Sequence, residues 1–73
     1  MSGMRESVIR MANQIARNFA VHGEEKAVAE TAEHISLFWD PRMKEMAAAL
    51  LAEPDCGLSP LALQSLQQVA KRA

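Results

Sequence analysis

Phe38-Trp39-Asp40-Pro41-Arg42-Met43 is the stretch on which the architecture of this chain depends. It contains the single Trp and one of the two Phe residues of a chain without Tyr. Asp40 can accept hydrogen bonds from the free backbone amides at a helix start, and Pro41 suits the first helical position. Two large aromatic side chains therefore lie directly before a change of chain direction. Such side chains contribute much of the burial energy of a small domain and much of the binding energy of an interface.

Three breaks divide the chain around this stretch into four segments with helical periodicity. The breaks are His22-Gly23, Asp40-Pro41 and residues 53–57. We expect helices over residues 5–21, 24–38 and 41–52, the third ended by Pro54, and a fourth that starts at Ser59-Pro60 and runs to residue 71. No segment alternates as a strand would. The chain is predicted to be all-α: one domain over residues 1–73, a compact bundle of about four short helices with mostly antiparallel neighbours and flexible ends.

The apolar faces of these helices predict the core. We expect Phe19, Ile35 and Phe38 to be largely buried together with Leu50 and Leu66. Phe38 fits the apolar stripe of the second helix, whereas Trp39 lies at the edge of that stripe. At such a position Trp39 either fills a corner of the core or stands out as an interface anchor, and the periodicity leaves both open.

The length of the chain limits its intrinsic stability. A domain of 73 residues has a core that supplies only about 3–5 kcal/mol, so domains of this size often depend on disulfides, metals or association. The one cysteine, Cys56, excludes an intrachain disulfide, and the spacing of His22 and His34 fits no short zinc motif. The remaining source of added stability is association, either with another protein or with a second copy of the chain.

The charge and hydropathy of the chain narrow the classes of partner. The net charge of −1 disfavours nucleic acid or an anionic membrane, because both require clustered cations. No apolar run reaches the length of a membrane span, and the N-terminus lacks the hydrophobic region of a signal peptide. We therefore expect a cytoplasmic protein.

No pattern of residues indicates catalysis or metal binding. The sequence has no Gly-rich phosphate loop, no nucleophile elbow, no paired cysteines and no HExxH motif. Cys56 has no cationic neighbour in sequence that would activate its thiol, and His34, beside Glu30 and Glu33, reads as a solvated helix residue. We expect no catalytic, cofactor-binding or metal-binding residues.

The polar face of the first helix is unusual in composition. It is rich in Arg, Asn and Gln where an ordinary solvated face carries Glu and Lys, and Asn disfavours helix. Guanidinium and amide groups form directional hydrogen bonds that suit a fixed partner surface. The competing interpretation is that they bond loops of this domain or face water. With the aromatic corner added, the predicted partner-binding residues are Arg10, Asn13, Gln14, Arg17, Asn18, Trp39 and Arg42.

Two stretches together resemble a known family. One is residues 11–19, MANQIARNF, and the other is His34-Ile35 followed by residues 38–43. With the helix start at residues 58–61, their spacing is similar to that of the small delta subunit of bacterial, soluble, NAD-dependent molybdenum formate dehydrogenases. The resemblance extends over most of the chain, from about Val8 to Val69.

The resemblance implies an accessory subunit without cofactor or active site of its own. In that family the larger subunits hold the bis-molybdopterin guanine dinucleotide, iron–sulfur clusters, FMN and NAD. The delta chain is thought to stabilise the complex or to help assemble it, at the step of cofactor insertion. The expected partner is the molybdenum-containing catalytic subunit. The alternative is a small helical regulatory or DNA-binding module, against which the acidic second helix counts.

Overall fold

The structure, a computed structural model, describes residues 3–53 and 55–72, and these form four α-helices and one short 3₁₀ turn. The elements in chain order are α1 (Met4–Phe19), η1 (Ala20–His22), α2 (Glu24–Phe38), α3 (Pro41–Leu50) and α4 (Pro60–Arg72). The predicted all-α class is confirmed, since no strand occurs within these ranges. Pro54, expected to end the third helix, and the outermost residues expected to be flexible lie outside the described residues.

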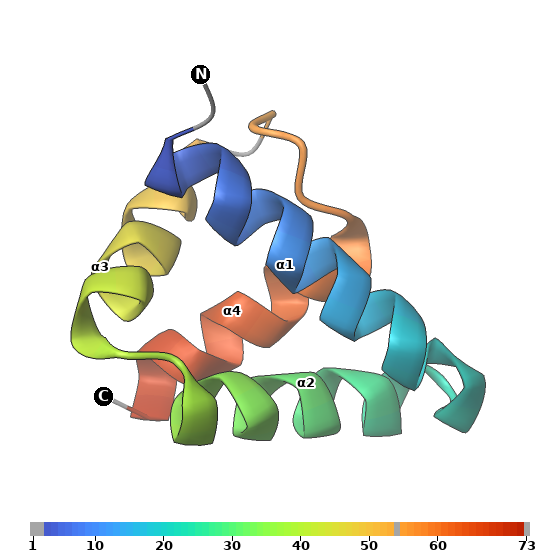
Figure 1. The fold of residues 1–73 in the computed structure, drawn as a ribbon. Helices are drawn as coiled ribbons and strands as arrows, with labels where there is room; N and C mark the ends of the chain where they lie inside the picture. The colour runs from blue at the N-terminus through green and yellow to red at the C-terminus, as the bar shows by residue number, and fades with distance from the viewer. Residues whose placement is uncertain (1–2, 54, 73) are drawn as a thin grey trace.

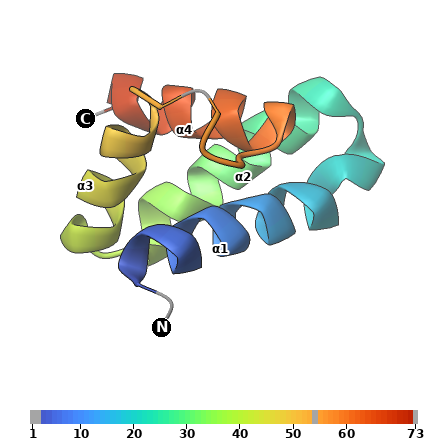
Figure 2. The ribbon, with the colours of Figure 1, turned by 90° about the horizontal axis from the view of Figure 1, so that it is seen from above.

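The helices cross one another more than they run antiparallel. Figure 1 shows α1 and α2 as two arms of a V that diverge from η1, with α3 across the open side. Seen from above in Figure 2, α1 and α4 lie along two sides of the molecule and α2 passes beneath them, and α1 and α4 also contact each other directly. The expectation of mostly antiparallel neighbours was therefore too simple, although α2 does pack against both α1 and α4. Among the described residues, no helix has the length and hydropathy that crossing a membrane requires.

Local sequence explains where the helices begin. Asp40 Oδ1 accepts a hydrogen bond from the Met43 amide at 2.9 Å, and Pro41 is the first residue of α3. At α4 the Ser59 hydroxyl accepts from the Ala62 amide at 3.1 Å, directly before Pro60. Both predicted starts are confirmed, with the side-chain caps that the sequence indicated.

The turn between α1 and α2 depends on a glycine. Gly23 has a φ of 94°, a conformation that side chains with a Cβ rarely adopt. It ends η1, and α2 begins at the next residue with Glu24 and Glu25 in its first turn, where carboxylates suit the helix dipole. The predicted bounds of the second helix agree with the structure, whereas the expected last turn of the first helix is the 3₁₀ segment η1.

The core is built mainly from small and aliphatic side chains. Ile35, Leu50 and Leu66 are fully buried as predicted, whereas Phe19 is only partly buried. Alanine side chains at helix contacts let the helix axes approach closely. The buried cluster consists of Val8, Ala12, Ala16, Ile35, Trp39, Ala47, Leu50, Ala62 and Leu66.

Of the two aromatic residues of the opening stretch, Phe38 is placed opposite to expectation, and Trp39 takes the core position that the sequence had left open. Phe38, predicted to be in the core, has 72% of its surface exposed, whereas only 5% of Trp39 is exposed. Helical spacing puts both positions beside the buried stripe, but α2 ends at Phe38. The Trp39 amide still donates to the Ile35 carbonyl at 3.0 Å, so the larger indole follows the last turn of α2 into the core four residues after Ile35, and only the chain beyond it turns away (φ −84°, ψ 138°). The prediction that Phe38 is buried was wrong for this reason.

One buried polar group suggests a stabilising substitution. Thr31 on α2 is 0% exposed, and its hydroxyl has no hydrogen-bond partner among the described residues. Because an unpaired buried hydroxyl is costly, Thr31→Val is expected to raise the free energy of unfolding by about 1 kcal/mol. Urea denaturation of both proteins measures this difference. A lower stability for the variant would mean that the Thr31 hydroxyl is hydrogen-bonded in solution.

Candidate partner-binding groove

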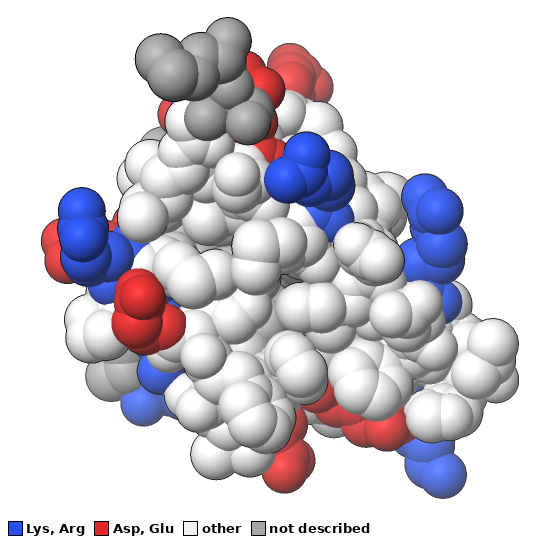
Figure 3. All heavy atoms as spheres, viewed as in Figure 1, with Lys and Arg blue, Asp and Glu red and all other residues white. Residues whose placement is uncertain are grey.

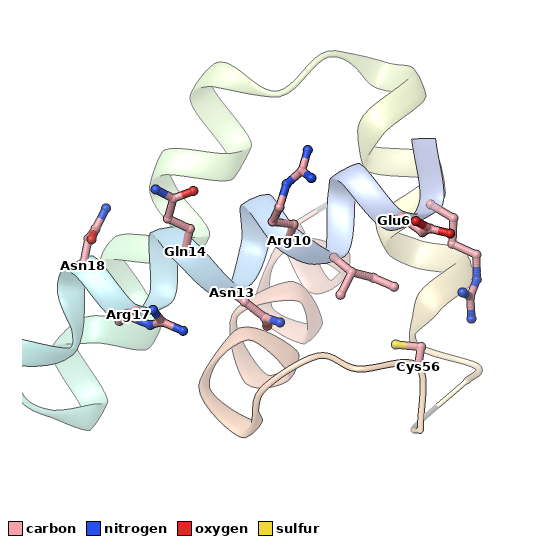
Figure 4. Close-up of a pocket in the computed structure, with 9 residues that line it drawn as sticks. Glu6, Arg10, Asn13, Gln14, Arg17, Asn18 and Cys56 are labelled. Atoms are coloured by element: carbon pink, nitrogen blue, oxygen red, sulfur yellow. The ribbon is translucent and has the colours of Figure 1, made fainter. Parts of the chain in front are cut away.

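A shallow groove of about 590 Å³ follows α1 and ends at the loop between α3 and α4. Five of the residues predicted to bind a partner line this groove (Figure 4). We call it the α1 groove, and its lining residues are Arg5, Glu6, Ile9, Arg10, Asn13, Gln14, Arg17, Asn18 and Cys56.

The side chains of the α1 groove spread over more than one side of the helix. In Figure 4, Arg10, Gln14 and Asn18 point to one side of α1. Asn13 points to the other side, toward the segment that carries Cys56. The lining residues of α1 therefore fall into two sets. Arg10, Gln14 and Asn18 face away from the domain's own loop, whereas Asn13 faces that loop.

Asn13 has both ends of its amide engaged within the domain. Its Nδ2 donates to the Gly57 carbonyl at 2.9 Å, and its Oδ1 accepts from the Ser59 amide at 2.8 Å. Gly57 has a φ of 112°, so the turn that presents its carbonyl favours glycine. Asn13 therefore fastens the loop before α4 to α1, which is the competing interpretation that the sequence had left open.

Arg10 and Arg17 differ from Arg5 in how their charge is balanced. Arg5 Nη2 lies 2.5 Å from Glu53 Oε1, and that hydrogen bond together with the carboxylate charge raises the pKa of the Arg5 guanidinium above its ordinary value. Arg10 and Arg17 are exposed and form no ion pair with any residue of the described ranges. Their donors are therefore available to carboxylate or carbonyl oxygens of another molecule.

The aromatic corner of the predicted site does not join this groove. Trp39 is in the core, so it cannot serve as an exposed anchor in the folded chain. Arg42, at the start of α3, is exposed and lines a separate hollow with Met4, Glu45, Met46 and Ala49. The structure thus brings together the five predicted residues of α1 and leaves the other two outside.

Four lining residues were absent from the sequence-based prediction. Arg5 and Glu6 continue the polar edge of α1 toward its N-terminus, so a longer helical template would have included them, whereas Ile9 is an apolar residue that also packs against the core. Cys56 arrives from a loop distant in sequence, and no local signal indicates its position. Its thiol is partly exposed. Among the residues that the structure describes, no three His, Cys, Asp or Glu side chains gather as a metal site would require.

Comparison with known proteins identifies one family. The family model described as NADH-dependent formate dehydrogenase delta subunit FdsD matches residues 7–66 of the 73-residue chain. This range contains both stretches that carried the resemblance and most of the α1 groove. Among curated proteins and among solved structures, none matches the chain.

Proposed function

Because the chain belongs to the family of NADH-dependent formate dehydrogenase delta subunits, we propose that it is a non-catalytic accessory subunit of such a complex in the cytoplasm. Its role is to stabilise the complex or to assist its assembly and cofactor insertion through protein–protein contacts. It holds no cofactor of its own, and the redox chemistry belongs to the larger subunits. The partner is the molybdenum-containing catalytic subunit.

The α1 groove is the proposed contact, and one observation carries the proposal: Arg10 and Arg17 stand exposed without an ion pair among the described residues. The neighbouring amides of Gln14 and Asn18 are also exposed. Such donors set the orientation of a partner through directional hydrogen bonds, while the loop fastened by Asn13 shapes one wall of the groove. Arg42, which lies outside the groove, remains a predicted partner residue.

Charge reversal on α1 tests the proposal. Arg10→Glu with Arg17→Glu is expected to abolish co-purification with the larger subunits and to lower the yield of active enzyme. Helicity and melting temperature are expected to stay almost unchanged, because exposed charges contribute at most about 1 kcal/mol to folding. The measurements are affinity co-purification, formate-dependent NAD reduction and circular dichroism.

A matched control reverses the same amount of charge elsewhere. Lys26 on α2 and Lys71 on α4 are exposed and lie outside the α1 groove. Lys26→Glu with Lys71→Glu is expected to co-purify like the wild type. Normal association of the α1 double variant would reject the α1 groove as the interface. Nucleic acid in place of the larger subunits in the wild-type preparation would reject the proposed function itself.

A further inference from the structure

The C-terminal end of α2 presents an apolar surface that the fold does not use. Leu37 and Phe38 are neighbours in sequence, and 69% and 72% of their surfaces are exposed. With Phe19 and His34 they line a shallow hollow of about 360 Å³. We call these four residues the α2-end patch. Exposed apolar patches on small soluble proteins mark interaction sites more often than chance.

The rings of the α2-end patch hold one another in place. The His34 and Phe38 ring centroids are 4.8 Å apart, with the planes inclined at 40°. The Phe19 and His34 ring centroids are 6.4 Å apart in an edge-on arrangement. Rings that already contact each other lose little conformational freedom on binding, which lowers the entropic cost of association.

The surroundings of the α2-end patch are acidic. Glu30 and Glu33 line the same hollow, and no Lys or Arg is among its described lining residues. Glu30 Oε1 lies 2.8 Å from His22 Nδ1, whereas Glu33 is exposed and forms no ion pair within the described ranges. Figure 3 shows an uncharged area over the middle of the α1–α2 side of the molecule, with both acidic and basic side chains along its lower edge.

These charges select the kind of partner. A second copy docked through the same patch would bring Glu30 and Glu33 of both chains together, and like charges at an interface are unfavourable. A partner surface that carries an apolar side chain flanked by Lys or Arg would pack against the aromatic rings and also pair with the carboxylates. Resting on the function proposed above, we infer that the α2-end patch docks such a basic, apolar segment of a larger formate dehydrogenase subunit, as a second contact apart from the α1 groove.

The experiment measures binding of the full-length chain to the larger subunits purified without it. Phe38→Ser is expected to weaken binding about tenfold or more, as loss of an aromatic anchor does, with the melting temperature unchanged because the ring is exposed. Val21 is 83% exposed and lies outside the hollow, so Val21→Ser is the matched apolar control and is expected to bind like the wild type.

The charge of the partner is tested on α2 itself. Glu33→Lys is expected to weaken binding at low salt, and the loss is expected to shrink as salt screens the charges. Glu25, exposed on the same helix but outside the hollow, provides the control Glu25→Lys, which is expected to leave binding unchanged. Tighter or unchanged binding of Glu33→Lys would overturn the basic character of the partner.

The outcomes separate this inference from the proposed function. If the wild type binds and the α1 double variant does not, but Phe38→Ser binds as tightly as the wild type, only the α2-end inference fails. If the wild type does not bind the larger subunits at all, both fail. Sedimentation of the wild type as a dimer that Phe38→Ser converts to monomer would assign the patch to a second copy and overturn the inference.

Discussion

Trp39→Ala is expected to leave the chain largely unfolded at room temperature. The indole is 5% exposed and belongs to the buried cluster with Ile35 and Leu50. Truncation of a buried Trp costs about 3–5 kcal/mol through lost transfer energy and the cavity left behind. That loss is comparable to the whole stability expected of a core of this size, about 3–5 kcal/mol. Far-ultraviolet circular dichroism during thermal and urea unfolding measures the effect.

The adjacent residue provides the control for this experiment. Phe38→Ala removes the other aromatic ring of this stretch one position earlier, but that ring is 72% exposed. Its stability is expected to change by no more than about 0.5 kcal/mol. A Trp39→Ala protein that melts like the wild type, or a Phe38→Ala protein that unfolds, would mean that the two aromatic residues exchange places in solution.

Asn13→Ala is expected to destabilise the chain by about 1–3 kcal/mol. The substitution removes the hydrogen bonds to the Gly57 carbonyl and from the Ser59 amide, and it leaves both backbone groups without these partners. Alanine is the better helix former, which offsets the loss by about 0.5 kcal/mol. Urea denaturation measures the total, and amide hydrogen exchange at Ser59 measures the local effect.

Two companion variants make the result specific to the fastened loop. Asn13→Asp keeps the acceptor for the Ser59 amide but loses the donor to Gly57, so its stability is expected to lie between those of the wild type and Asn13→Ala. Gln14, the next residue on α1, is exposed, and Gln14→Ala is expected to be nearly neutral. Unchanged exchange at Ser59 in Asn13→Ala would show that the loop is held by other contacts.

The helices could be predicted from sequence because their signals are local. Asp40-Pro41 and Ser59-Pro60 act within a single turn, and both cap the helices as expected. Gly23 likewise marks the boundary before α2 by its own backbone conformation. Which of Phe38 and Trp39 is buried could not be predicted from local signals. Helical spacing places both residues beside the buried stripe, so the outcome depends on where α2 ends relative to the core.

The candidate site likewise has one part that local sequence predicts and another that depends on long-range contacts. Helical spacing alone brought five predicted residues into the α1 groove, because residues three and four apart are neighbours on the surface of a helix. The bonds of Asn13 to Gly57 and Ser59 join positions 44 and 46 residues apart. The periodicity of α1 contains no information about such contacts. The same applies to Cys56, which reaches the groove only through the path of the loop.

The burial of Trp39 also makes it an optical reporter. It is the only Trp in a chain without Tyr, so the intrinsic ultraviolet emission of the protein comes essentially from one indole in the core. That emission is expected to be blue-shifted in the native chain and to move to longer wavelength on unfolding. Because the indole is buried and lines neither proposed contact surface, the spectrum of the isolated chain registers the integrity of the fold in every variant that retains Trp39.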